Sequence, residues 1–264
     1  MSRKISTIGI VSPADWLDPE ILQQGAEDLR GRGFAVKIHP ACHRQKGRFA
    51  GDDKSRASAL MEFYADSEID LLLAAKGGYG SMRLLDLIDY EIIKSNPKPL
   101  CGSSDNTAII NGIFAKTGNQ GFISPMVLDF AAGKSTTGLA EFLSMVAAPA
   151  PKETTIGGNM AVFMGLFGTE FLPDPGGKIL VLEEIAEPIY KIDRMFRQLW
   201  LSGYLQKLAG LKIGWFKNIS DSPVRPSGFS LDDILDELDE SLPYKITRDF
   251  AFGHGTNSHT LPIG

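Results

Sequence analysis

The strongest constraint on the fold is the continuous apolar run DLLLAA at residues 70–75, which is followed at once by the glycine-rich segment GGYG at residues 77–80. Such a run is typical of a strand buried on both faces of a parallel sheet, because a strand with one solvated face would alternate apolar and polar residues. Further strands are expected at residues 6–11, 34–39, 100–102 and 120–123, and helices at 19–30, 53–65 and 81–88. This alternation predicts a doubly wound parallel sheet, in which sites gather at the carboxyl ends of the strands.

The second half of the chain has a different pattern. Residues 131–151 are rich in Ala, Gly, Ser, Thr and Pro around a helix-like segment, as expected of a connection between domains. Beyond it, strands are expected at residues 178–182, 211–216, 244–247 and 260–263, and helices at 160–167, 190–204 and 231–238. We therefore predict an N-terminal domain over residues 1–135, a linker over 136–152 and a mixed α+β C-terminal domain over 153–264.

Charge and apolar patterning narrow the class of protein. With 27 basic and 32 acidic residues, the net charge of −5 offers no basic field for nucleic acid or for an anionic membrane. No run approaches the roughly 20 apolar residues that cross a bilayer, and no signal-peptide pattern precedes the first expected strand. We expect a cytoplasmic protein with no nucleic-acid or membrane partner, and, since no Cys/His spacing fits zinc, no metal and no cofactor.

A strand, a glycine turn, a serine and a helix start follow one another in the segment LCGSSDNT at residues 100–107. A serine at such a turn is exposed above a helix N-terminus, which favours developing negative charge. Asn106 stands where the nucleophile turn of the α/β-hydrolases has its second glycine, so the motif here is G-x-S-D. The same pattern also fits a turn without catalysis, and the choice depends on partner residues elsewhere in the chain.

A serine nucleophile needs a base and an orienting acid. Among the four histidines, His254 is flanked by glycines on both sides, which leave open space around the imidazole. Glu183 directly follows a buried strand, where an unpaired carboxylate would be costly. Glu184 is its rival, and strand alternation predicts that these two carboxylates lie on opposite faces.

The developing oxyanion needs backbone N–H donors. The segment at residues 77–80 offers exposed N–H groups at a strand-to-helix turn, and the N–H of Asp105 is a second candidate donor. A phosphate-binding loop is the competing interpretation, because glycine-rich turns that open helices bind anions well. Neither the P-loop pattern nor the dinucleotide-binding glycine pattern is present here.

Taken in order, these segments make the chain similar to the LD-carboxypeptidase family of serine peptidases. This family of muramoyltetrapeptide carboxypeptidases also includes the microcin C immunity proteins. The resemblance is colinear over nearly the whole chain. It is carried by IGIVSP at residues 8–13, KGGYG at 76–80, GSSDNTA at 102–108, GGNM at 157–160, LEE at 182–184, YKIDRM at 190–195, GHG at 253–255 and LPIG at 261–264.

The resemblance implies a catalytic triad with Ser104 as nucleophile, His254 as general base and Glu183 as orienting acid. It implies an oxyanion hole made by the N–H groups of Asp105 and of one glycine of the Gly77-Gly78 pair, of which we favour Gly78. The expected reaction releases a terminal D-alanine from a muropeptide tetrapeptide without a metal. The expected architecture is a Rossmann-like N-terminal domain and a C-terminal domain with a β-barrel-like sheet, in a homodimer.

The chain departs from the family pattern at Ser103, a position that is often aromatic, and this leaves a second serine beside the nucleophile. Recognition of a terminal carboxylate needs a cation, for which Lys76 and Arg194 are the candidates, with Arg83 as a further one.

Two other functions stay open. The first is hydrolysis of a peptidyl or aminoacyl nucleotide of the microcin C type, with Trp16 or Trp215 stacking on the base. The second is a non-catalytic small-ligand binding protein built from two α/β lobes.

Overall fold

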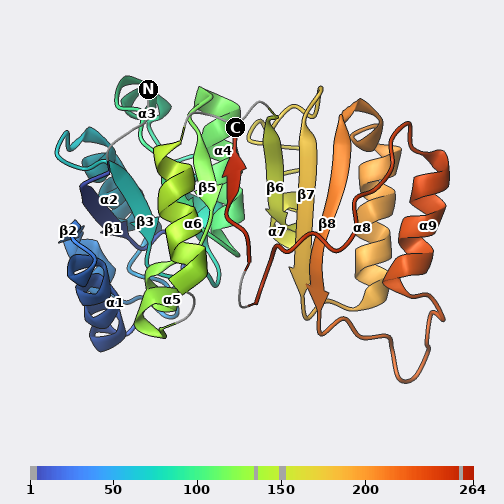
Figure 1. The fold of residues 1–264 in the computed structure, drawn as a ribbon, viewed down its shortest axis with the longest axis horizontal. Helices are drawn as coiled ribbons and strands as arrows, with labels where there is room; N and C mark the ends of the chain where they lie inside the picture. Colours follow the sequence, from blue (N-terminus) through green and yellow to red (C-terminus); the bar gives the residue numbers. More distant parts are fainter. Residues whose placement is uncertain (1–4, 134–135, 149–152, 256–257) are drawn as a thin grey trace.

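The computed structural model describes residues 5–133, 136–148, 153–255 and 258–264 of the chain. Two sheets stand side by side, each covered by helices; the chain forms five strands of the first sheet, then the second sheet, and returns to the first with its last strand (Figure 1). No helix among these residues is both long and apolar enough to cross a membrane. The mixed α/β fold expected from the alternation of strands and helices is confirmed.

The first sheet has the strand order β2-β1-β3-β4-β5-β9. Its first five strands run parallel, and β9 pairs antiparallel with β5, with Phe122 opposite Pro262. The strands are β1 (Thr7–Val11), β2 (Ala35–Ile38), β3 (Leu71–Ala74), β4 (Leu100–Gly102), β5 (Gly121–Ile123) and β9 (Leu261–Ile263).

Helices pack on both faces of this sheet, as the apolar run in β3 predicted. Leu72 belongs to one buried cluster, whereas Leu71 and Leu73 belong to the cluster on the opposite face. The helices are α1 (Pro19–Gly31), α2 (Asp53–Ala65), α3 (Tyr90–Ser95), α4 (Asn106–Thr117), α5 (Val127–Ala131) and α6 (Thr136–Ala147), with a short 3₁₀ turn η1 (Pro40–His43). α1 and α2 begin where Asp18 and Asp52 accept backbone N–H groups.

The helix expected at residues 81–88 is wrong in extent. Only the 3₁₀ turn η2 (Ser81–Leu84) forms, and α3 begins soon after it. The side chain of Asp89 accepts the N–H groups of Glu91 and Ile92, so this residue caps a new helix instead of continuing the old one.

The second sheet is parallel with the order β6-β7-β8. Its strands are β6 (Thr155–Asn159), β7 (Ile179–Ile185) and β8 (Gly210–Lys217), and the helical segments are α7 (Met160–Met164), α8 (Ile189–Leu201), η3 (Leu205–Lys207) and α9 (Leu231–Ser241). The strand expected at residues 244–247 makes a single bridge, between Lys212 and Thr247. The strand expected at 260–263 is β9, which joins the first sheet. Within the described residues the second sheet therefore has three strands and does not close on itself.

The two halves share one hydrophobic core. A single buried cluster contains Leu72 and Ile109 of the first half together with Ile156 and Leu180 of the second. The segment expected as a linker contains α6, whose Phe142 is buried in the first half's other cluster. Residues 149–152, at the end of that segment, lie outside the described residues.

Candidate active site

Ser104 stands at a sharp turn between β4 and α4. Its backbone φ of 56° lies in the left-handed region, which residues other than glycine rarely adopt. Such strain is typical of a nucleophile turn, where the hydroxyl is raised above the following helix. Ser103 has no such backbone strain, so the geometry distinguishes the two neighbouring serines.

The glycine loop, residues 77–80, packs directly against this turn. A Cβ on Gly77 would lie 2.8 Å from the Cβ of Ser104 and 3.2 Å from its Oγ. Asn106 holds the two segments together, because its Nδ2 donates to the carbonyl of Ser103 at 3.0 Å and to that of Lys76 at 3.3 Å. Asparagine at position 106 therefore has a structural reason: it joins the serine turn to the start of the loop.

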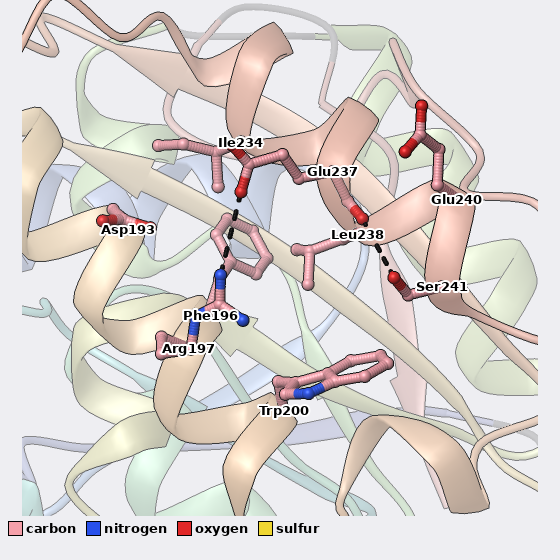
Figure 2. A pocket seen from close by; sticks show the side chains of 9 residues that line it. All are labelled: Asp193, Phe196, Arg197, Trp200, Ile234, Glu237, Leu238, Glu240 and Ser241. Carbon is pink, nitrogen blue, oxygen red and sulfur yellow. Dashed lines mark hydrogen bonds and ion pairs between the residues drawn. The ribbon is translucent and has the colours of Figure 1, made fainter.

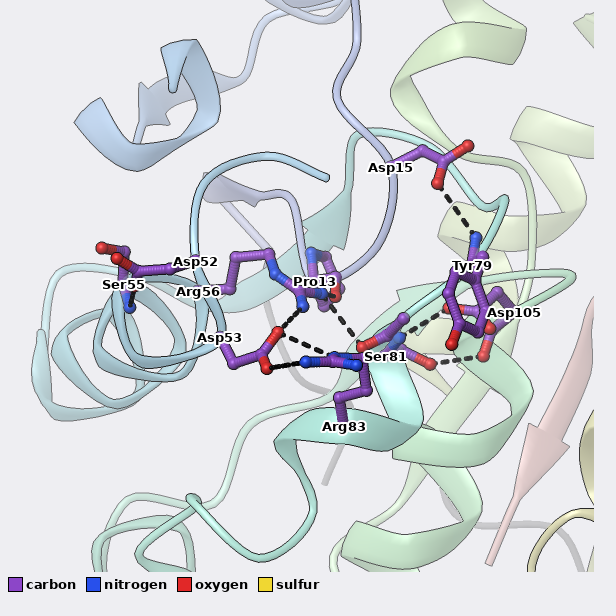
Figure 3. A network of polar contacts seen from close by, with 11 residues as sticks. Pro13, Asp15, Asp52, Asp53, Ser55, Arg56, Tyr79, Ser81, Arg83 and Asp105 are labelled. Carbon is purple, nitrogen blue, oxygen red and sulfur yellow. Dashed lines mark hydrogen bonds and ion pairs between the residues drawn. The ribbon is translucent and has the colours of Figure 1, made fainter. Parts of the chain in front are cut away.

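The N–H groups of Gly78 and Asp105 make no hydrogen bond within the described residues. Gly78 has φ +109° and lies so close to Asp15 that a Cβ would come within 2.2 Å of the carboxylate. Asp15 accepts the N–H of Tyr79 at 3.1 Å (Figure 3), which holds this part of the loop in place, and its carboxylate also pairs with Arg48 at 2.7 Å. Sequence reasoning missed Asp15, because nothing near residue 15 indicates a contact with residue 79.

Glu183 and His254 meet across the second half of the chain. Glu183 Oε2 lies 2.8 Å from His254 Nδ1, and its carboxylate is almost fully buried at the end of β7. This hydrogen bond raises the pKa of His254 above the ordinary 6.5. Gly253 must be glycine, since a Cβ there would lie 2.8 Å from the Cβ of Glu183 at a φ of +124°.

Glu184 serves another purpose. Its carboxylate accepts the N–H of Ala161 at 2.7 Å and that of Ile185 at 2.8 Å, away from the histidine. Burial raises the pKa of Glu184. The prediction that the two carboxylates lie on opposite faces is not met in full, because the register of β7 shifts between Leu182 and Glu184 and a single nitrogen, Nδ2 of Asn159, donates to both of them.

Asn159 connects the two glutamates to the serine turn. Its Nδ2 donates to Glu184 Oε1 at 2.8 Å and to Glu183 Oε1 at 3.3 Å. Its backbone N–H donates to Thr107 Oγ1 at 3.1 Å, in the first turn of α4. Sequence reasoning gave Asn159 no role, although it ends β6 directly opposite Glu183 in the parallel register.

The structure thus forms two groups, Ser104 with Gly77 and His254 with Glu183. No hydrogen bond joins Ser104 to His254 in the part of the chain that is described. Catalytic hydrogen bonds are often long without substrate, so this does not disqualify the pair. A hydrogen-bonded path within the described residues leads from the Ser104 carbonyl, which accepts the N–H of Thr107 at 2.9 Å, through Thr107 Oγ1 and Asn159 to Glu183.

The cation candidates lie in different settings. Arg194 is exposed on α8, with its guanidinium 5.4 Å from the Tyr190 ring, and no contact links it to the triad candidates in the described chain. Arg83 is paired with Asp53 at 2.6 Å. Lys76 is half-buried and directly precedes Gly77.

The side chains of Trp215 and Lys217 lie beside the loop that carries His254, with the lysine ammonium over the indole ring. Sequence reasoning did not predict this pairing. The Lys217 Nζ lies 4.5 Å from the Trp215 ring centre. A Cβ on Gly255 would lie within 2.8 Å of Trp215 and 2.4 Å of that Nζ, so both side chains pack against the residue after His254.

A separate pocket of about 280 Å³ lies between α8 and α9 (Figure 2). Phe196, Trp200 and Leu238 contribute apolar side chains to its lining, and the lining also includes Arg197 and Glu237, which are 3.7 Å apart. It contains none of the residues expected to act in catalysis.

Comparisons with known proteins show which family the chain belongs to. The family description "LD-carboxypeptidase N-terminal domain" matches residues 8–124, and "LD-carboxypeptidase C-terminal domain" matches residues 153–264. The probable murein peptide carboxypeptidase of Bacillus subtilis (strain 168) is 33% identical over 283 aligned positions, which cover 99% of this chain and 88% of that protein. The chain belongs to the LD-carboxypeptidase family. It is therefore a serine peptidase, as the resemblance in its motifs implied.

Two further members of the LD-carboxypeptidase family illustrate its range. The microcin C7 self-immunity protein MccF of Escherichia coli is 26% identical, covering 98% of this chain and 88% of that protein. The crystal structure of the muramoyltetrapeptide carboxypeptidase from Oxalobacter formigenes matches with a TM-score of 0.89 at 28% identity, covering 98% of this chain and 93% of that chain.

Proposed function

We propose that this enzyme is an LD-carboxypeptidase that releases the C-terminal D-alanine of muropeptide tetrapeptides through a Ser104-His254-Glu183 triad. The observation that carries the proposal is the 2.8 Å contact between buried Glu183 and His254, in a chain whose strained Ser104 lies in the turn just before α4. The names of the relatives in Bacillus subtilis and Oxalobacter formigenes support the substrate class.

In this mechanism the Oγ of Ser104 attacks the carbonyl carbon of the scissile amide while His254 Nε2 takes its proton. Glu183 holds the Nδ1–H and stabilises the imidazolium that forms. The N–H groups of Asp105 and Gly78 stabilise the oxyanion, with that of Gly77 as the alternative to Gly78. The C–N bond then breaks, His254 protonates the leaving amine of D-alanine, and water resolves the acyl-enzyme with His254 again acting as base.

The terminal carboxylate of the substrate needs a cation near Ser104. We assign this role first to Lys76, because it adjoins Gly77, which touches Ser104. Arg194 is the second candidate, and its stacking on Tyr190 would have to rearrange to reach a ligand.

A peptidyl or aminoacyl nucleotide is the second candidate substrate. The observation that favours it is the Trp215 ring beside Gly255, since an indole next to the catalytic base can stack on a purine. The name of the MccF relative is consistent with this alternative.

The test is release of D-alanine from a purified muramoyl tetrapeptide by the wild type and by Ser104→Ala, with Ser103→Ala as the matched control. We expect Ser104→Ala to lose at least ~10³-fold in kcat and Ser103→Ala to stay within about tenfold of wild type. Inactive wild type would reject the muropeptide substrate and direct the assay to aminoacyl nucleotides. An active Ser104→Ala would reject the nucleophile.

A further inference from the structure

The side chain of Asp105 binds Ser81, the residue that follows the glycine loop. Its Oδ2 accepts the N–H of Ser81 at 2.7 Å, and the hydroxyl of Ser81 donates back to the Asp105 carbonyl at 2.5 Å. Asp105 is 5% exposed and Ser81 is fully buried. The two residues thus form a closed, water-excluded pair of hydrogen bonds between the serine turn and the loop.

The same end of the loop is also held from the other side. Arg56, which is fully buried, donates to the carbonyl of Gly80 at 3.0 Å and to that of Pro13. Asp53 neutralises this guanidinium by an ion pair (Figure 3). Gly80 is therefore fixed between Arg56 on one side and the Asp105–Ser81 pair on the other.

The start of the loop is fixed to the serine turn by Asn106, which donates to the Lys76 carbonyl. Asp105 and Asn106, which are adjacent in sequence, therefore form hydrogen bonds with opposite ends of the loop. Gly77 and Gly78, between these two attachments, carry the candidate N–H donors, and Gly77 packs against Ser104. The distance between those N–H groups and the N–H of Asp105 depends on both attachments.

We propose that the Asp105 carboxylate is a positioning residue that sets the width of the oxyanion hole. It does so by binding Ser81, so that the Asp105 N–H and the N–H of the glycine loop converge on one oxygen. The inference rests on the proposed serine hydrolase mechanism. A hole that is too wide still binds substrate, but it loses the hydrogen bonds that strengthen only as the oxyanion forms.

The test compares Asp105→Ala, Asp105→Asn and Ser81→Ala in the D-alanine release assay, with binding of a peptide boronate as a second readout. Asparagine at position 105 keeps an oxygen that accepts the Ser81 N–H, whereas alanine keeps none. We expect Asp105→Ala to lose about 10²-fold in kcat with KM within about twofold, and its boronate affinity to fall in parallel. Asp105→Asn should stay within about tenfold of wild type, with Ser81→Ala in between.

Asp52→Ala is the matched control, because Asp52 also accepts a backbone N–H, that of Ser55 at 2.8 Å, away from the serine turn. Its kcat should equal that of wild type. The inference is overturned if Asp105→Ala keeps full kcat, if Asp105→Asn falls as far as alanine, or if KM alone changes. If Asp105→Ala does not fold, the same measurement is made on Ser81→Ala: a lower kcat at nearly unchanged KM supports the inference, and an unchanged kcat overturns it.

An active Ser104→Ala would instead refute the proposed mechanism itself. The two failures are therefore distinguishable.

Discussion

The side chain of Asn111 pairs with the backbone of Gly157 as a neighbouring strand would. Its Nδ2 donates to the Gly157 carbonyl at 2.8 Å, and its Oδ1 accepts the Gly157 N–H at 3.0 Å. Position 157 has to be glycine, since its φ is +114° and a Cβ would lie 2.2 Å from the Val181 carbonyl. α4, which begins beside Ser104, is thereby fixed to the sheet that carries Glu183.

Asn111→Ala should destabilise the protein. The change leaves the N–H and C=O of Gly157 buried without partners, which costs about 2–4 kcal/mol in the free energy of unfolding. Chemical denaturation would measure this loss, with exposed Gln198→Ala as the control. An unchanged midpoint would show that the pairing with Gly157 does not stabilise the junction between the sheets.

Gly77→Ala should reduce activity. The new Cβ would lie 2.8 Å from the Cβ of Ser104 and must displace the nucleophile. We expect kcat to fall at least ~10-fold, because small misplacement of a reacting group is costly. Gly210→Ala is the matched control, since its Cβ would meet nothing closer than 3.8 Å. Equal activities would contradict the packing of Gly77 on the serine.

The pH dependence should report the Glu183–His254 contact. His254 acts as a base only when neutral, and Glu183 raises its pKa, so kcat/KM should fall on the acid side with a midpoint above 6.5. Glu183→Gln should move that midpoint to lower pH and reduce kcat by roughly 10³-fold.

The same contact makes a contribution to stability that is fully present below pH 6.5 and is lost as the pH rises through the raised pKa. Glu62→Gln is the matched control for the Glu183 variant, because Glu62 also contacts a histidine, His39, at 2.9 Å. A pH profile that does not change in Glu183→Gln would remove Glu183 from the triad.

Asn159→Asp should be inactive and less stable at neutral pH. The substitution replaces the donor shared by Glu183 and Glu184 with a third buried carboxylate. The raised pKa of Glu184 means that unfolding free energy already falls as the pH rises above 4.5, and this fall should steepen in the variant. Thermal unfolding between pH 4.5 and 8 would measure it, with Asn96→Asp as the control.

Local pattern was sufficient for the five parallel strands of the first sheet. The apolar run in β3 predicted a strand buried on both faces, and the glycine turn after β4 placed Ser104 at a strand end, where the structure shows a strained φ. Both features depend on residues close together in the sequence. The triad roles came from the resemblance to the family and stay predictions until the variants are assayed.

The parts that sequence reasoning missed depend on contacts between distant segments. Asp15 reaches Tyr79, and Thr107 accepts the N–H of Asn159, across 64 and 52 positions of the chain. An asparagine or aspartate in isolation gives no sign of such a partner. β9 was expected as a strand, but its partner β5 lies more than a hundred residues earlier, and no local pattern specifies that pairing.

The pairing of β9 with β5 makes the protein interlaced. The last strand of the C-terminal half, β9, belongs to the sheet of the N-terminal half, and β9 begins a few residues after His254 in the chain. An N-terminal half produced alone would present β5 as an open edge, able to accept the same strand from another molecule. A copy that exchanged β9 in this way would bring its own histidine close to a neighbour's serine.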